Sequence, residues 1–326
     1  MTRHVHLLDP PAADALAALR ERLDPAVALT LGPETPRPAR YQVLVAGRPG
    51  PEHLDASPDL CALLIPWAGL PEATRELMAR YPHVAVHNLH YNAVPAAEMA
   101  LALLLAAAKS LLPMDRALRA HDWTPRYNPS PSPLLHDKTA LILGYGAIGQ
   151  HLARLCRALG MHVLATRRHA ERASPDDPAA VYPPEALNHL LPQADVLLIC
   201  LPHTPATDGL IGAAELAQLR PGAVLVNVGR APIVQEAALY QALRDGTLHA
   251  AGLDVWYHYP PDEAARAHTP PSRYPFHTLD NVVMSPHRAG AVRDKEGHRM
   301  AHLARALNVA ARGELLPNPV DLDAGY

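Results

Sequence analysis

Short apolar runs alternate with stretches of helical periodicity along most of the chain. Runs bounded by turn residues are typical of buried strands, and apolar residues spaced three and four apart are typical of helices that cover a sheet. Strands are expected at Val5–Leu8, Val27–Leu31, Tyr41–Ala46, Ala62–Ile65, Val84–Val86, Thr139–Leu143, Met161–Ala165, Ala194–Leu201, Ala223–Val228, Ala250–Val255 and Asn281–Met284. Helices are expected at Ala12–Leu23, Glu72–Tyr81, Ala96–Ala120 with an interruption near Pro113, Gln150–Leu159 and Glu296–Arg312. This alternation indicates the α/β class, with parallel sheets covered by helices.

One glycine-rich turn stands between an expected strand and an expected helix, at Gly144-Tyr145-Gly146-Ala147-Ile148-Gly149. Gly144 permits a tight turn, Gly146 lets the backbone approach a pyrophosphate, and Gly149 lets the helix pack close to the strand. The free N–H groups at the start of the helix face the anion. A lone G-x-G-x-x-G arises by chance, but its succession of strand, turn, helix and second strand predicts a dinucleotide site.

The residues after the second strand of this unit predict which dinucleotide binds. An NAD site usually carries an acidic residue there for the ribose hydroxyls. Here the chain reads Thr166-Arg167-Arg168-His169, and no acidic residue occurs between Gly149 and Glu171. Arg167 and Arg168 are therefore expected to bind the 2′-phosphate of NADPH or NADP⁺, with NADH or NAD⁺ as the weaker alternative. The other interpretation is that both arginines are ordinary surface cations.

Size and composition limit the number of domains and the kinds of partner, but they do not indicate an activity. A chain of 326 residues is long enough for two domains, and its net charge of −3 gives no reason to expect nucleic acid or an anionic membrane as a partner. Cys61, Cys156 and Cys200 are odd in number and lie in apolar surroundings, as expected for reduced core thiols in a cytoplasmic protein. Met99 to Ala108 is apolar but too short to span a bilayer, so a buried helix is expected. No zinc-type spacing occurs.

Several separate motifs occur in one order along the chain. They are Leu135–Thr139 leading into the glycine turn, Leu201–Thr207, Arg220–Arg230, Ala251–Trp256 and Ser285–Gly290. With these motifs, the chain from about Gly69 to Asn318 resembles the NAD(P)-dependent D-isomer specific 2-hydroxyacid dehydrogenase family, whose relatives include formate and phosphite dehydrogenases. The resemblance is specific because the motifs agree together.

The resemblance implies two doubly wound parallel-sheet domains. A flavodoxin-like substrate domain is expected at residues 1–93 and 289–326, and a Rossmann domain for NAD(P) is expected between them, at residues 94–288. A homodimer formed through the nucleotide domain is also implied. The residues implied to contact the coenzyme are Gly144, Gly146, Ala147, Ile148, Gly149, Arg167, Arg168, Leu201, Pro202, Thr207, Val228, Gly229, Asp254, His287 and Ala289.

The family motifs also imply how a small 2-oxo or 2-hydroxy acid is held. Arg230 matches the arginine that binds the substrate carboxylate and 2-oxo group through its planar fork of donors. His287 matches the general acid that protonates the carbonyl oxygen. Asn92 matches an asparagine beside the substrate, and the turn at Ala68, Gly69 and Leu70 matches a carboxylate-binding loop, although its sequence departs from the usual glycine-valine pattern.

The chain departs from the family where most members pair the histidine with a glutamate, five residues after the Asp254 position. That position is Tyr259, which cannot stabilise an imidazolium by charge. One interpretation makes Tyr259 a catalytic partner that orients His287 by a hydrogen bond, with a rate that falls at lower pH than in relatives. The other has Glu263 or His258 assist instead. Formate dehydrogenases also lack this carboxylate.

These features predict an NADPH-preferring oxidoreductase that reduces a small 2-oxo acid to the D-2-hydroxy acid. Two alternatives stay open. The missing glutamate suits a dehydrogenase of a small anion such as formate or phosphite. The fold also serves nucleotide-sensing corepressors similar to the C-terminal-binding proteins, some of which keep catalytic residues.

Overall fold

A computed structural model describes residues 2–326 and divides the chain into two compact units. Unit 1 comprises Met1–Asn92 and Val292–Tyr326, and unit 2 comprises Ala93–Ala291. Each unit contains one sheet in which every paired strand is parallel, with five strands in unit 1 and seven in unit 2. The expected α/β class with two doubly wound sheets is confirmed.

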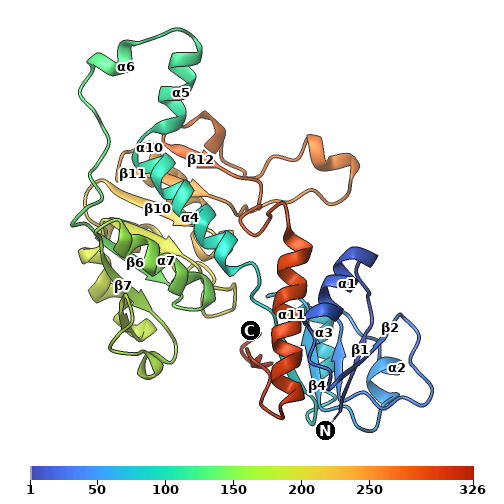
Figure 1. Cartoon of the computed structure of the whole chain (residues 1–326). Helices are drawn as coiled ribbons and strands as arrows, with labels where there is room; N and C mark the ends of the chain where they lie inside the picture. Colours follow the sequence, from blue (N-terminus) through green and yellow to red (C-terminus); the bar gives the residue numbers. More distant parts are fainter. Residues whose placement is uncertain (1) are drawn as a thin grey trace. The chain divides into compact units, whose positions relative to one another are not determined.

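Unit 1 has the strand order β2-β1-β3-β4-β5 of flavodoxin-like sheets. Helices α1 and α11 pack on one face, and helices α2 and α3 cover the other. The element bounds are β1 Arg3–Leu7, α1 Ala13–Arg22, β2 Val27–Leu31, β3 Val43–Val45, α2 Pro51–Asp55, β4 Ala62–Ile65, α3 Glu72–Met78, β5 Ala85–Asn88 and α11 Lys295–Ala311. The unit therefore takes its last helix from the far end of the chain, as the colours of Figure 1 show.

Unit 2 has the strand order β12-β11-β10-β9-β6-β7-β8, the Rossmann order with one added strand. Its strands are β6 Thr139–Leu143, β7 His162–Thr166, β8 Ala180–Tyr182, β9 Val196–Ile199, β10 Ala223–Asn227, β11 Leu248–Leu253 and β12 Val282–Met284. Its α-helices are α4 Ala93–Ala108, α5 Leu111–Arg119, α6 Thr124–Tyr127, α7 Ala147–Ala158, α8 Leu187–Leu190, α9 Ala213–Gln218 and α10 Glu236–Arg244. The order of strands reverses beside β6, so a ligand site is expected at the carboxyl ends of β6 and β9.

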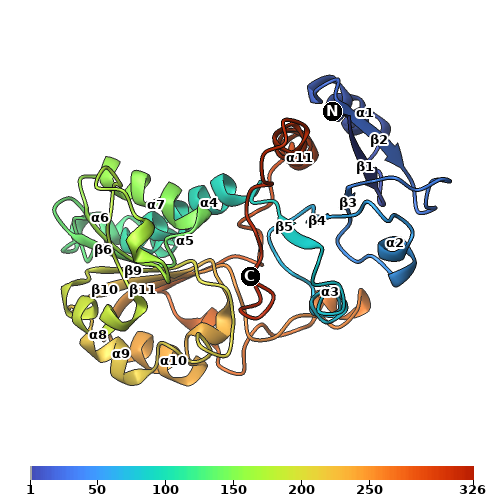
Figure 2. The same ribbon diagram turned by 90° about the horizontal axis from the view of Figure 1, so that it is seen from below.

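The helices of unit 2 lie on both faces of its sheet (Figures 1 and 2). α4 and α7 cover one face, and α8, α9 and α10 cover the other. α4 approaches β11 closely because Gly252 has no side chain, and a Cβ there would lie 2.7 Å from the Cβ of Leu103. No single helix within residues 2–326 meets the length and hydropathy needed to cross a membrane, although α4 and α5 meet them together across a 66° bend.

Two local expectations were wrong, and one strand was not expected. The long helix expected at Ala96–Ala120 is two helices that separate at Lys109 and Ser110, where Ser110 has φ 51°, and Pro113 lies in the first turn of α5 because proline is tolerated there. Cys61 is exposed and not a core thiol, whereas Cys156 is buried. Strand β8 was not expected, because its three residues form too short a run to read as a strand from sequence.

Candidate active site

The glycine turn connects β6 to α7 with the geometry that a dinucleotide site needs. Gly144 has φ 99°, a conformation that side chains rarely adopt, and a Cβ on Gly149 would lie 2.2 Å from the carbonyl oxygen of Gly144. A Cβ on Gly146 would meet no atom within 4 Å, so the space in front of the turn is open. α7 begins at Ala147, and the first N–H groups of a helix have no partner inside it. These residues fit a bound pyrophosphate.

The two arginines follow β7 directly, at the edge of the same turn. Arg167 donates its backbone N–H to the carbonyl of Tyr182 at 2.9 Å, so β8 fixes its position, and its side chain is partly exposed while that of Arg168 is exposed. Asp177 lies close to Tyr145, whose pKa is raised to about 12 by burial and by that carboxylate. The segment after Glu171 therefore brings the carboxylate of Asp177 close to the glycine turn, which the sequence pattern did not indicate.

Two loops at the carboxyl ends of β9 and β10 touch each other beside the glycine turn. A Cβ on Gly229 would lie 2.6 Å from the carbonyl oxygen of Leu201, so only glycine allows this approach. Thr207 donates its hydroxyl to the carbonyl of Pro202 at 2.8 Å and closes the first loop. Val228 is buried beneath the second. Five of the residues that the family motifs imply for coenzyme contact therefore lie on two adjoining loops of unit 2: Leu201, Pro202, Thr207, Val228 and Gly229.

Arg230 lies just past β10 with its side chain exposed. Its Nη1 donates to the carbonyl of Gly229 at 2.8 Å. Asn227 holds the loop from inside, since its amide accepts the Gly229 N–H at 3.0 Å and donates to the Arg230 carbonyl at 3.0 Å. The remaining guanidinium donors stay available for an anionic ligand.

His287 and Tyr259 form a hydrogen-bonded pair. The Tyr259 hydroxyl lies 2.9 Å from Nδ1 of His287, and the backbone N–H of Trp256 donates to the same hydroxyl oxygen at 3.2 Å. Because the phenol oxygen already accepts from Trp256, its own hydrogen is free to point to an unprotonated Nδ1. In a neutral imidazole this direction leaves the proton on Nε2, and in the imidazolium form Nδ1–H donates to the phenol oxygen instead.

Asp254 fixes the loop that carries His287. The side chain is fully buried, and its carboxylate accepts from the Ser285 hydroxyl at 2.5 Å, the Arg288 N–H at 2.8 Å and the Ala289 N–H at 2.9 Å. His287 lies between these donors with φ 55°, a conformation uncommon for a residue with a side chain. Strained backbone of this kind concentrates at functional sites, where the surroundings enforce it.

The electrostatic setting lowers the pKa of His287. Desolvation by burial is the main cause, and the nearby positive charge of Arg230 adds to it, while Asp254 opposes the shift. Arg230 and His287 come from distant parts of the sequence but both belong to unit 2, on the loops that follow β10 and β12, and the charge of Arg230 contributes to the lowered pKa of His287. At neutral pH the imidazole is therefore mostly uncharged.

The remaining predicted substrate-binding residues are part of unit 1. Ala68, Gly69, Leu70 and Asn92 belong to unit 1, where Asn88 donates its amide to the Ala68 carbonyl at 2.8 Å and steadies the turn. Their contact with substrate stays a prediction. No three His, Cys, Asp or Glu side chains within residues 2–326 group as a metal site.

Neither substitute proposed for the missing glutamate contacts His287 by a hydrogen bond within residues 2–326. Glu263 pairs with Arg266 at 2.7 Å, and His258 is exposed and donates its backbone N–H to Pro271. Sequence reasoning missed Asn227 and the backbone N–H of Trp256, which position Arg230 and Tyr259. Asn227 ends the strand that precedes Arg230, which was the available signal.

A Rossmann unit with a glycine turn at the start of a helix, and with an arginine and a histidine on loops at the carboxyl ends of its strands, is typical of nucleotide-dependent dehydrogenases. The family model for the D-isomer specific 2-hydroxyacid dehydrogenase, NAD binding domain, matches residues 101–289. This range is more than half of the chain, and the chain belongs to that family.

Known relatives are similar over most of the chain. D-3-phosphoglycerate dehydrogenase of Mycobacterium leprae is 33% identical over 276 residues, which cover 84% of this chain and 49% of the relative. Glyoxylate reductase of Aeropyrum pernix is 37% identical over 232 residues, which cover 69% of this chain and 65% of the relative. The chain thus spans about half the length of the phosphoglycerate dehydrogenases that it matches. The solved D-isomer specific 2-hydroxyacid dehydrogenase of Xanthobacter autotrophicus Py2, in complex with NADPH and MES, shares the fold at TM-score 0.77 and 24% identity over all of both chains.

Proposed function

We propose that the chain is an NADPH-preferring reductase that converts a small 2-oxo acid to the D-2-hydroxy acid. The observation that carries the proposal is the 2.9 Å hydrogen bond between Tyr259 and Nδ1 of His287, on the same unit as Arg230 and the glycine turn. The coenzyme, when bound, supplies the hydride. Glyoxylate reductase activity of a relative that is 37% identical supports the same chemistry.

In this mechanism each group of the chain has one task. Arg230 directs its free guanidinium donors at the carboxylate and 2-oxo oxygen, which lowers the energy of the charge that develops there. His287 gives the proton on Nε2 to the carbonyl oxygen. Tyr259 holds Nδ1, and Asp254 holds the backbone on both sides of the histidine. The proton is best supplied by the imidazolium form, so reduction should slow as pH rises.

The proposed reaction is tested by assaying coenzyme and substrate together. We expect the purified protein to oxidise NADPH in the presence of glyoxylate, hydroxypyruvate or pyruvate, with kcat/KM about 10- to 100-fold higher for NADPH than for NADH, since each arginine contact to a phosphate contributes about 1.5–3 kcal/mol. Oxidation of formate or phosphite with no 2-oxo acid reduction would contradict the proposal. Nucleotide binding without turnover on any of these acids would favour the corepressor alternative.

The coenzyme preference has its own matched control. Replacing Arg167 and Arg168 together by serine should remove the advantage of NADPH while leaving kcat with NADH unchanged. Arg172, an exposed arginine a few residues further on, provides the control, because Arg172→Ser should leave the preference intact. A double variant that still prefers NADPH would show that other groups bind the 2′-phosphate.

The role of Tyr259 is tested by the pH dependence of kcat/KM for reduction. The pKa of His287 is lowered, so the protonated fraction falls, and the rate with it, as pH rises through a value below the ordinary histidine pKa of 6.5. Tyr259→Phe should lower the rate about three- to tenfold, since one hydrogen bond contributes about 1 kcal/mol. Tyr259→Glu should move the pH limb upward, because a carboxylate stabilises the imidazolium. An unchanged rate and profile in the phenylalanine variant would exclude an orienting role.

We also propose a homodimer formed through unit 2. Residues 111–134, which include α5 and α6, extend away from the sheet of this unit (Figure 1) and expose large apolar side chains. Leu111 is 57% exposed, Trp123 60%, Tyr127 80% and Leu134 68%. Exposed aromatic and aliphatic side chains of this size are typical of surfaces that a partner covers.

A further inference from the structure

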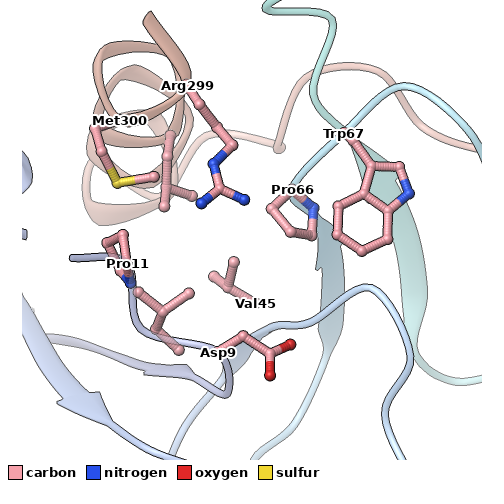
Figure 3. Close-up of a pocket in the computed structure, with 9 residues that line it drawn as sticks. Asp9, Pro11, Val45, Pro66, Trp67, Arg299 and Met300 are labelled. Atoms are coloured by element: carbon pink, nitrogen blue, oxygen red, sulfur yellow. The ribbon is translucent and has the colours of Figure 1, made fainter. Parts of the chain in front are cut away.

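The cavity of unit 1 is too small to hold an organic ligand. It lies among side chains from β1, β3, α11 and the loops beside them, which Figure 3 shows. Its volume is about 30 Å³, whereas pockets that hold ligands are roughly 300–1,000 Å³. The guanidinium of Arg299 at its wall already donates to Glu296 at 2.6 Å, so this cavity suggests no ligand.

In unit 2, Trp256 donates one hydrogen bond toward each member of the pair formed by Tyr259 and His287. Its backbone N–H donates to the hydroxyl oxygen of Tyr259 at 3.2 Å. Its indole Nε1–H donates at 2.8 Å to the carbonyl of Ser285, on the loop that carries His287. The Trp256 side chain is only 6% exposed, so little water reaches the indole bond.

The carbonyl of Ser285 is the contact through which the indole acts on His287. The backbone N–H of His287 donates to this same oxygen at 3.0 Å. A carbonyl oxygen has two lone pairs, so it can accept both bonds. His287 has φ 55°, a conformation that persists only where the surroundings enforce it. The indole N–H therefore holds the peptide group to which the backbone of the histidine is bonded.

The indole ring is itself held by the core of unit 2. It lies edge-on against Phe276, with the ring centroids 6.2 Å apart and an angle of 71° between the planes. Phe276 is buried and lies edge-on against Tyr240 of α10, at 5.4 Å between centroids. Because packed aromatic rings have little freedom to move, these contacts set the position of the indole N–H.

Asp254 and Trp256 hold the loop after β12 in complementary ways. The carboxylate of Asp254 accepts hydrogen bonds from donors of this loop, whereas the indole of Trp256 donates to one of its acceptors. Of these two residues, Trp256 alone also donates to Tyr259 within residues 2–326. Trp256 is therefore bonded to both sides of the pair.

We infer that Trp256 is a positioning residue that sets Tyr259 and His287 at hydrogen-bond distance from each other. Its main-chain donor holds the phenol, and its indole donor holds the backbone of the histidine. A side chain that only filled space here could be replaced by phenylalanine without effect on the pair. The inference rests on the proposed function where the rate is concerned, but the bond between Tyr259 and His287 can be observed without turnover.

The first test uses ¹⁵N NMR of the full chain labelled in its histidine side chains, at a pH above the ordinary histidine pKa of about 6.5. The Nδ1 signal of His287 is identified by its loss in His287→Gln, and Tyr259→Phe gives its position without the phenol hydroxyl. Trp256→Phe should move the signal toward that position. Replacing Trp256 by β-(3-benzothienyl)alanine, which keeps the shape of the indole with sulfur in place of N–H, should do the same. Phe276→Leu is the control, because it loosens the ring contact but keeps the N–H.

The second test measures rates with glyoxylate. We expect both replacements of Trp256 to lower kcat about three- to tenfold, the effect of one hydrogen bond, with the KM for NADPH unchanged. In a His287→Gln background, Trp256→Phe should lower the remaining kcat less than about twofold, because its effect passes through the histidine. Phe276→Leu should lower the melting temperature and leave kcat nearly unchanged.

Replacements of Trp256 that leave the Nδ1 signal at its wild-type position would overturn the inference, as would an equal movement of the signal in Phe276→Leu. An equal fall in rate with and without His287 would likewise overturn it. If the wild type reduces no 2-oxo acid while the signal moves as expected, the proposed function fails and the positioning role of Trp256 stands.

Discussion

Replacing His287 by glutamine is expected to lower kcat for 2-oxo acid reduction by about 10²–10⁴-fold, the contribution of a positioned general acid. Glutamine keeps a hydrogen-bond donor near the carbonyl oxygen but has no proton to transfer. The KM for NADPH should change little, because the glycine turn and the arginines after β7 remain in place. The measurement is steady-state kinetics with glyoxylate, together with the pH profile, whose histidine limb should vanish.

A matched control separates this effect from a general loss of histidine. His268 is exposed in the segment between β11 and β12, so His268→Gln should leave both kcat and the pH profile unchanged. If His287→Gln retained more than about a third of the wild-type kcat, another group would have to supply the proton, and Tyr259 would be the next residue to change.

Replacing Asp254 by asparagine is expected to damage both stability and rate. The carboxylate accepts three hydrogen bonds, and an amide in its place turns one acceptor into a donor that faces backbone N–H groups. Leaving one or two buried donors unpaired costs roughly 2–5 kcal/mol, so the melting temperature should fall by roughly 5–15 °C. Because the loop then releases His287 from its position, kcat should fall by about 10²-fold.

The pH profile of the Asp254→Asn variant tests the same role of Asp254, because the direction of its shift can be predicted. Asp254 opposes the lowering of the His287 pKa, so removing its charge should move the limb of the pH profile to still lower pH. Asp280→Asn is the control, since Asp280 forms an exposed ion pair with Arg116 at 2.8 Å and surface pairs contribute little. An Asp254→Asn protein with unchanged melting temperature and rate would show that the Ser285–Ala289 loop is held by other contacts.

Structural features that depend on residues close together in the sequence could be predicted from the sequence alone. The turn from Gly144 to Gly149 follows from the needs of a strand, a tight bend and a helix start, which lie within a few residues of each other. The apolar runs that became β6, β9 and β10 are each long and continuous enough to indicate buried strands. The fold class therefore needed no information from distant parts of the chain.

Features set by distant residues were not open to the same reasoning. The exposure of Cys61 depends on where β4 lies in its sheet, and three residues of β8 form a strand only because β7 is beside them. Asp254 was expected near the coenzyme, but its three hydrogen bonds to the loop after β12 appear only in three dimensions.

The composition of unit 1 from both parts of the chain has a consequence for biosynthesis. A ribosome completes Ala93–Ala291 before it makes α11, whose buried face packs on α1 and β1 and whose Asn308 bonds to Arg22 and Asp24. Domains fold as units while the chain emerges. Unit 2 can therefore fold while the N-terminal part of unit 1 still lacks α11. During that time the face of unit 1 that α11 later covers exposes apolar surface, which a chaperone would recognise.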